Sequence, residues 1–153
     1  MRTDRAARLI AGFFGCGLSP VAPGTVGSAA AIALGIPLLR LPPIALTLAI
    51  LAVTIAGVWA IRAGRIEDDP GWVVIDEVAG QWTALLGLAA PTAPGLLAAF
   101  LVFRLLDVAK PGPVGWADRQ AGAAGIMADD LIAGGIAAGI LWAARSHWPG
   151  IFG

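Results

Sequence analysis

The chain has 153 residues, of which 58% are hydrophobic and only 13% are charged. Its mean hydropathy of +0.83 excludes a disordered protein and an ordinary soluble domain, in which about a quarter of the residues are charged. Ten Lys and Arg balance ten Asp and Glu, so no net positive charge favours nucleic acid as a partner. The single cysteine, Cys16, excludes an internal disulfide and a cysteine zinc cluster.

The charged residues fall in short clusters that are separated by long uncharged runs. These runs cover residues 9–39, 41–61, 78–103 and 131–144. About 20 apolar residues in a helix cross the hydrocarbon core of a bilayer, and the runs have this order of length. The sequence therefore predicts a multi-pass integral membrane protein, with the lipid bilayer as a partner and a single domain over residues 1–153.

The first uncharged run is too rich in Gly and Pro to be helical throughout. Residues 15–28 are expected to form a loop against the protein or the membrane surface, because bare loop backbone cannot face lipid. An apolar helix is predicted from about residue 26 to 39. Prolines around Arg40 then form a turn, and a second helix is predicted over residues 44–61.

The third run is interrupted by the segment Pro91-Thr92-Ala93-Pro94-Gly95, which cannot continue a helix. Each arm of about a dozen residues covers only ~18 Å, so a hairpin of short or tilted helices is expected. The last helix is predicted over residues 125–142. The expected fold is all-α: a compact multi-helix membrane protein with about five to six helices, including this proline-broken hairpin.

The distribution of basic residues predicts the orientation. With the N-terminus inside, eight of the ten Lys and Arg are cytoplasmic, and only Arg40 and Arg145 are outside. The same orientation brings eight of the ten acidic residues to the cytoplasmic face, at Asp68, Asp69, Asp76, Glu77, Asp107, Asp118, Asp129 and Asp130. This convergence depends on the hairpin, because one long helix over residues 78–103 would separate the clusters.

The acidic clusters are the strongest chemical signal. Residues 67–77 hold five carboxylates, and Asp129 and Asp130 form a pair within an apolar helix. Adjacent carboxylates among apolar residues repel each other and are costly to bury unless a positive group neutralises them. A hard divalent cation such as Mg²⁺ serves this purpose, while the alternative is that these acids cap helix ends or are solvated.

Basic residues follow in the next polar segment. Arg104 and Asp107 are three residues apart on one helical face, and Lys110 lies one step further, before Pro111 ends the helix. Arginine and lysine beside carboxylates suit a phosphate held against a metal, but a structural ion pair near the membrane explains them equally well. Residues 24–28 could present backbone N–H groups to a phosphate at a helix start, or Thr25 could serve as an ordinary N-cap.

Four sequence blocks in this order resemble the phosphatidylglycerophosphatase A family of bacteria. They read GLSPVAPGTVGS (17–28), IDEVAGQW (75–82), FRLLDVAKPGPVGWADR (103–119) and GIMADDLIAG (125–134). The resemblance extends over roughly residues 12–148. It implies an enzyme of the bacterial inner membrane, with its active site facing the cytoplasm. Such an enzyme uses Mg²⁺ to hydrolyse the phospholipid phosphatidylglycerophosphate to phosphatidylglycerol and phosphate.

The resemblance also implies roles for individual residues. The metal ligands are expected among Asp76, Glu77, Asp129 and Asp130. The candidate catalytic residues are Asp69, Asp107 and Asp118, with Asp69 or Asp107 as the general base for direct attack by water. The substrate phosphate is expected at Arg104, Lys110, Arg119, Thr25 and Ser28. The stretch 120–125 departs from the family pattern, which puts the conformation of that loop in question.

Two other functions compete with this hypothesis. One is a non-catalytic membrane scaffold with the same fold, and the other is a transporter of divalent cations. A transporter should carry ionisable residues near the middle of the bilayer, whereas the clusters here are expected at helix ends. Another lipid phosphate, such as phosphatidic acid, is an alternative substrate. No pattern in the sequence indicates an oligomeric state.

Overall fold

The computed structural model describes residues 2–67 and 69–152, and these residues contain helices but no strand. The prediction of an all-α fold is thereby confirmed. The helical elements are α1 (Arg2–Ala11), η1 (Phe13–Leu18), α2 (Pro23–Leu38), α3 (Pro43–Ala63), α4 (Ile75–Leu85), α5 (Ala93–Ala109), α6 (Pro113–Asp118), α7 (Gly122–His147) and α8 (Pro149–Phe152). The described residues thus form more helices than the five or six expected, because short segments such as η1, α6 and α8 lack the long apolar runs used for prediction.

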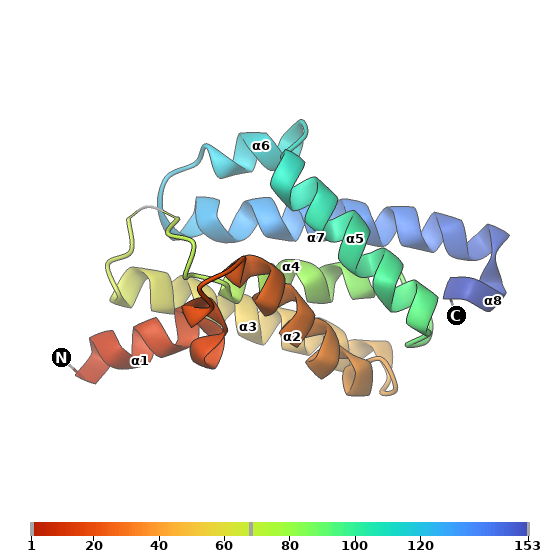
Figure 1. Ribbon diagram of the computed structural model, residues 1–153, viewed down its shortest axis with the longest axis horizontal. Coiled ribbons are helices and arrows are strands. Elements are labelled where there is room, and N and C mark those ends of the chain that lie inside the picture. The colour runs from red at the N-terminus through yellow and green to blue at the C-terminus, as the bar shows by residue number, and fades with distance from the viewer. Residues whose placement is uncertain (1, 68, 153) are drawn as a thin grey trace.

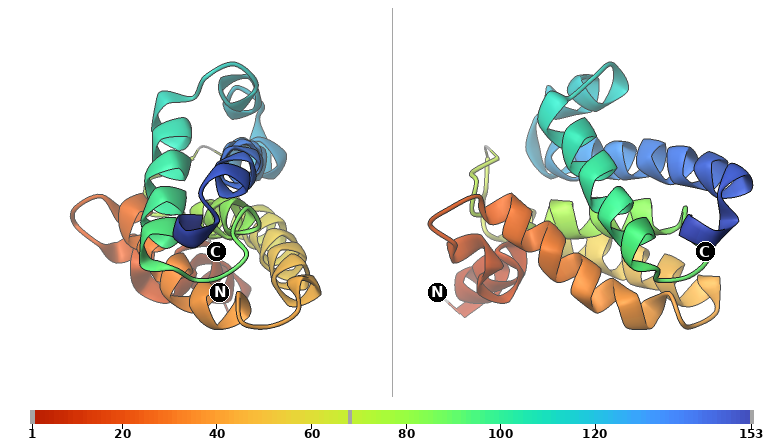
Figure 2. Two further views of the ribbon diagram at one scale, coloured as in Figure 1. Left: turned by 90° about the vertical axis from the view of Figure 1, so that its right-hand side faces the viewer. Right: turned by 45° about the vertical axis from the view of Figure 1, so that its right-hand side comes forward.

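The short helix α4 is the centre of the molecule. It packs against α2, α3, α5 and α7, which enclose it in the end-on view of Figure 2. The indole Nε1 of Trp82 donates to the carbonyl oxygen of Ala31 at 2.7 Å and ties α4 to α2. In Figure 1, α4 and α7 run side by side along the long axis, with α5 crossing in front of α7.

Two glycines allow α4 and α7 to approach closely. A Cβ atom on Gly80 would lie 2.6 Å from the carbonyl oxygen of Asp130, and one on Gly134 would lie 2.2 Å from the carbonyl oxygen of Gly80. A larger side chain at either position would therefore force the two helices apart. This contact places the first turn of α4 beside the acidic pair of α7.

The expected loop over residues 15–28 is wrong in its second half. The helix α2 begins at Pro23, because proline has the φ angle of a first helical position and needs no N–H partner there. Ala22 is the N-cap residue, so Thr25 lies within the first turn and does not cap the helix. Within residues 15–28, the irregular part is limited to the residues before Pro23. The 3-10 element η1, which covers part of it, is kinked at Phe14 and Gly15.

The proline-broken hairpin is present. The segment between α4 and α5 spans residues 86–92, and the Thr92 hydroxyl oxygen accepts a hydrogen bond from the Gly95 N–H at 3.2 Å. Pro94 lies in the first turn of α5, where it causes no break. The turn lies at the end of the molecule away from the N-terminus, so the start of α4 and the end of α5 lie toward the opposite end (Figure 1).

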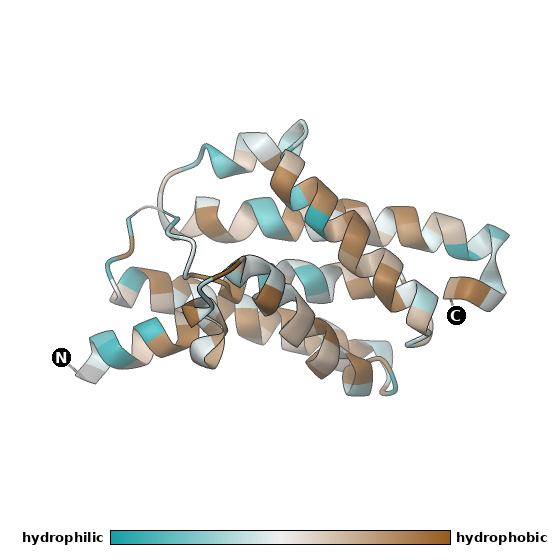
Figure 3. Cartoon of the chain, in the orientation of Figure 1, coloured by the Kyte–Doolittle hydropathy of each residue, from teal (hydrophilic) through white to brown (hydrophobic). Residues whose placement is uncertain are grey.

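Among the residues that the structure describes, two helices are long and apolar enough to cross a membrane, α3 and α7. The outward face of α3 carries bulky apolar side chains such as Leu48 and Ile55, which are exposed. Figure 3 shows apolar residues along most of α2, α3 and α5, while hydrophilic residues lie on the later turns of α5, at the end of α6, on the first half of α7 and on α1. The polar chemistry is thus concentrated toward one end of an otherwise apolar molecule.

Candidate metal and phosphate site

Three carboxylates from two helices form a compact cluster. Asp76 and Glu77 lie in the first turn of α4, and Asp130 lies in α7. One oxygen from each residue lies within 4.8 Å of the others. Asp76 and Asp130 are only 4% and 3% exposed, so water hardly screens their mutual repulsion.

The electrostatics of this cluster favour a cation. Burial and the adjacent Glu77 carboxylate hold the pKa of Asp76 well above its ordinary value. Burial also raises the pKa of Glu77, although Asp76 and Arg104 oppose this change. Oε2 of Glu77 and Oδ1 of Asp130 are buried and have no hydrogen-bond partner among the described residues. Buried carboxylate oxygens without partners are suitable ligands for a hard divalent cation, so these residues fit a metal site.

Arg104 of α5 borders the cluster. Its Nη1 atom lies 3.8 Å from Oε1 of Glu77 and forms an ion pair with Asp107, three residues further along the same helix. The N-terminal end of α2 meets this pair, because a Cβ atom on Gly24 would lie 2.1 Å from Oε1 of Glu77 and 3.2 Å from Nη1 of Arg104. The first turn of α2, with the backbone N–H groups that open a helix and its positive dipole end, therefore lies against the acidic cluster.

A second group of charges surrounds Lys110, the residue that ends α5 in a left-handed conformation. Its Nζ atom donates to Oδ2 of Asp129 at 2.8 Å and also pairs with Asp118. Partial burial by itself lowers the pKa of Lys110, but the bonds to Asp118 and Asp129 raise it above its ordinary value. Lys110 is therefore a fixed positive charge at neutral pH.

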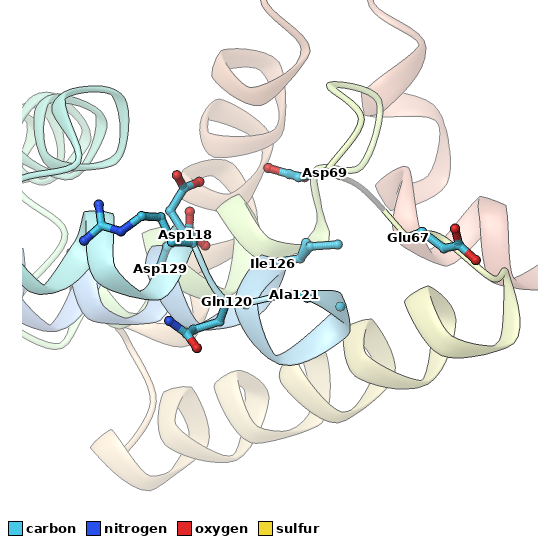
Figure 4. A pocket seen from close by; sticks show the side chains of 10 residues that line it. Glu67, Asp69, Asp118, Gln120, Ala121, Ile126 and Asp129 are labelled. Atoms are coloured by element: carbon cyan, nitrogen blue, oxygen red, sulfur yellow. The ribbon is translucent and has the colours of Figure 1, made fainter.

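A cavity of about 260 Å³ opens beside this second group, between α6, the start of α7 and the segment before α4. Figure 4 shows Asp118 and Asp129 close together, Asp69 across the cavity from them, and Glu67 further away. Desolvation and the nearby Asp129 carboxylate raise the pKa of Asp69 to about 6. Asp69 also adds to the electrostatic repulsion that raises the pKa of Asp76.

The structure separates the site residues expected from the sequence into two charged groups. Three of the expected metal ligands come together, whereas the fourth, Asp129, pairs with Lys110 because adjacent residues of a helix do not face the same side. Arg119 lines the 260 Å³ cavity beside Lys110 and its partners. Asp68, one of the clustered acids, lies outside the described residues.

The two hydroxyl residues of α2 are not equivalent. Thr25 is exposed on the first turn, where a ligand can reach it. Ser28 is fully buried, and its hydroxyl donates to the carbonyl oxygen of Gly24 at 2.9 Å. The expectation that Ser28 contacts the phosphate is therefore corrected: its hydroxyl is directed into its own helix, as is common for serine inside helices.

Gln81 has no role in the sequence-based hypothesis but belongs beside the cluster. It lies one helical turn after Glu77 on α4, is fully buried, and both polar atoms of its amide have no partner among the described residues. A buried amide without partners is costly unless water or another group satisfies it. The signal in the sequence is an amide four residues after an acid, within an otherwise apolar run.

The fold and the site together define a class: a helical protein with two membrane-capable helices and, at one end, an acidic cluster that could hold a metal beside basic groups that could hold a phosphate, as a lipid phosphatase requires. The profile of the phosphatidylglycerophosphatase A family matches residues 9–145. The chain belongs to the phosphatidylglycerophosphatase A family, as the four sequence blocks indicated.

Individual relatives agree with this assignment. Phosphatidylglycerophosphatase A of Escherichia coli is 40% identical over 92% of this chain and 84% of its own length. The protein of the same name from Haemophilus influenzae is 34% identical over 92% of this chain and 88% of its own length. A Bacteroides thetaiotaomicron protein, provisionally named a phosphatidylinositol-3-phosphatase, is 40% identical over 82% of this chain and 85% of its own length. No solved structure matches the chain.

Proposed function

We propose that this protein removes the terminal phosphate of phosphatidylglycerophosphate and releases phosphatidylglycerol and inorganic phosphate. The observation that carries the proposal is the position of Arg104 and the first turn of α2 against the Asp76, Glu77 and Asp130 cluster. A buried anionic cluster beside a guanidinium and a helix N-terminus can hold a metal and a phosphate at the same time. Family membership supports the choice of substrate.

The cation in this proposal is Mg²⁺, held by Asp76, Glu77 and Asp130. When bound, it would neutralise charge on a phosphate oxygen and promote attack by water. Glu77 and Asp130 each offer an oxygen that has no hydrogen-bond partner among the described residues, so a cation can bind these two atoms without displacing a hydrogen bond. Asp129 is proposed instead to position Lys110, to which it is bonded.

The chain's own groups then bind and orient the phosphate. Arg104 offers donors beside the metal cluster, and Asp107 fixes the guanidinium. Lys110 and Arg119 add positive charge on the side of the 260 Å³ cavity. Donors fixed before the substrate binds need no reorganisation as charge develops, which is the main requirement for phosphoryl transfer.

Asp69 is the proposed general base. A carboxylate with a pKa of about 6 is ionised at neutral pH and is still basic enough to accept a proton from the attacking water. The other candidate, Asp107, is held in an ion pair with Arg104 and is better suited to position that side chain. Asp118, the third candidate, is paired with Lys110 and is assigned to positioning as well.

The membrane arrangement is also part of the proposal. We place α3 and α7 across the bacterial inner membrane, with the polar end of the molecule toward the cytoplasm. This orientation keeps most Lys and Arg inside and presents the site to a head group at the cytoplasmic surface, while the acyl chains stay in lipid.

Phosphate release by the purified protein in neutral detergent tests the function. Phosphatidylglycerophosphate, phosphatidic acid and phosphatidylinositol 3-phosphate are compared, each with Mg²⁺ and with EDTA. The proposal expects Mg²⁺-dependent release that is fastest with phosphatidylglycerophosphate. Faster release from phosphatidylinositol 3-phosphate would transfer the assignment to the activity named for the Bacteroides relative. No release from any lipid by folded protein would reject the enzyme.

A further inference from the structure

A second, larger cavity lies away from the acidic groups. It measures about 540 Å³ and is formed by α1, η1 and the segment before α4. Two arginines, three large apolar residues and a set of glycines form its wall, namely Arg5, Arg8, Leu9, Leu18, Trp72 and the glycines at 12, 15 and 17. None of these residues takes part in the proposed hydrolysis. A cavity of this size can hold part of a small amphiphile.

The polar part of the wall is basic. The guanidinium carbon of Arg8 lies 5.5 Å from the centre of the Trp72 ring, which fixes it by a cation–π contact. Arg5 lies one turn earlier on α1 and is exposed. The acidic neighbour is Asp4 on the same helix, which also interacts with Arg65. The immediate surroundings therefore carry more positive than negative charge and favour an anion.

The rim of the cavity is apolar and exposed. Leu9 and Leu18 line the cavity and are 52% and 82% exposed, and the nearby Phe14 and Val21 of the same N-terminal segment are 71% and 74% exposed. Water contact at such a patch is unfavourable, whereas the boundary between head groups and acyl chains is a suitable environment. Basic residues on a short amphipathic helix beside exposed apolar side chains are typical of segments that bind anionic lipid at the membrane surface.

The N-terminal segment that forms the cavity is held in place by contacts with the segment before α4. The Val74 N–H donates to the carbonyl oxygen of Ala11 at 2.9 Å. A Cβ atom on Gly17 would lie 1.9 Å from the carbonyl oxygen of Trp72, so only glycine permits this contact. The N-terminal segment is thus bound to residues 72–74, which lead directly into the metal-binding turn of α4.

We propose that this cavity binds one anionic phospholipid of the surrounding bilayer. Arg5 and Arg8 hold the phosphodiester of the head group, and the upper parts of the acyl chains lie along Leu9, Leu18 and Phe14. The ligand is a membrane lipid rather than a free phosphate, because the wall joins the charged groups to an exposed apolar rim. This lipid is additional to the substrate, whose phosphate is assigned to Arg104 and α2.

Native mass spectrometry of the full chain in neutral detergent tests this proposal without relying on catalysis. Dioleoyl phosphatidylglycerol is titrated against wild type, an Arg5→Gln/Arg8→Gln variant and a matched Arg40→Gln/Arg145→Gln control. We expect one retained phosphatidylglycerol in wild type and control. Loss of two basic contacts should weaken its binding roughly 30-fold in the Arg5→Gln/Arg8→Gln variant. Phosphatidylcholine should not replace it.

Four results would overturn the proposal. Equal weakening in both double variants would indicate charge attraction without a site. Equal retention of phosphatidylcholine would show that the cavity does not select an anionic head group. Displacement of the lipid by sn-glycerol 3-phosphate at equal concentration would show that the acyl chains do not contribute to binding. A dimer that forms in place of lipid binding would assign the surface to a second copy. A Leu18→Gln variant, which keeps both arginines and changes an exposed residue, should also weaken lipid retention.

Discussion

Gly24 of α2 lies directly against Glu77 of α4, so closely that a Cβ atom at residue 24 would come within 2.1 Å of the Glu77 carboxylate. The contact joins the helix that offers backbone donors to the helix that carries two of the proposed metal ligands. It also explains why a glycine opens the sequence Gly-Thr-Val-Gly-Ser at this point: the backbone must meet a side chain of the site.

Gly24→Ala should therefore inactivate the enzyme without unfolding it. The added methyl group must displace Glu77 or Arg104, and a misplacement of about 1 Å at a reacting centre lowers turnover roughly 100-fold. Initial rates of phosphate release measure the effect. Gly135→Ala, a position where the new Cβ meets no atom within 4 Å, is the matched control and should retain full activity. Equal activity of both variants would show that the close contact has no catalytic importance.

Asp76→Asn should stabilise the metal-free protein and abolish its stabilisation by Mg²⁺. The folded, metal-free protein keeps the Asp76 pKa above its ordinary value of 3.8, so it binds more protons than the unfolded chain. Its stability should therefore decrease as the pH rises above that ordinary value. Removing the repulsion should add about 1–3 kcal/mol at neutral pH.

Thermal unfolding in EDTA and in Mg²⁺ measures both effects of Asp76→Asn. Wild type should gain stability from Mg²⁺ and the variant should not, while Asp4→Asn on α1 should behave like wild type. A metal-free variant less stable than wild type would mean that Asp76 is not under electrostatic strain.

The pH profile should identify the general base. Because the base must be deprotonated to accept a proton, kcat/KM should rise with pH through about 6, the pKa of Asp69. Asp69→Asn should remove this rise and lower turnover by about 10²–10⁴-fold. If the variant retained the same rise, another group would be the base. Asp107→Asn is the comparison, and it should weaken phosphate binding while the pH dependence remains.

Lys110→Met should destabilise the protein. Its Nζ atom satisfies Oδ2 of Asp129 at 2.8 Å, and Asp129 is only 4% exposed. Leaving that oxygen without its partner should reduce the free energy of unfolding by about 1–3 kcal/mol. Chemical unfolding in detergent measures the change. Combining the substitution with Asp129→Asn should recover part of the loss, and additive losses would contradict the coupling.

Much of the fold could be predicted from the spacing of charges. The uncharged runs located α3 and α7, and the prolines at 91 and 94 predicted the hairpin that brings Glu77 and Arg104 together. The start of α2 was misplaced because Gly and Pro are typical of loops, yet proline is favoured at the first helical position. Local composition does not distinguish these two uses of proline.

The sequence predicted which types of residue form the site, but not which of those residues contact one another. Asp129 and Asp130 are neighbours in sequence, but their side chains leave α7 in different directions and join different groups. Ser28 and Gln81 are both buried, one with its hydroxyl satisfied by its own helix and one without partners in the described part of the chain. These differences depend on helix packing, which motif spacing does not encode.

The Mg²⁺ dependence of phosphate release by Asp129→Asn and Asp130→Asn variants tests the central claim most directly. Both substitutions remove one charge from adjacent positions of α7, so they control for each other. The account predicts that Asp130→Asn raises the Mg²⁺ concentration for half-maximal rate roughly tenfold or more, the range known for losing a group that supports a metal. Asp129→Asn should lower the rate with an unchanged Mg²⁺ requirement. The opposite pattern would contradict a metal site at Asp76, Glu77 and Asp130.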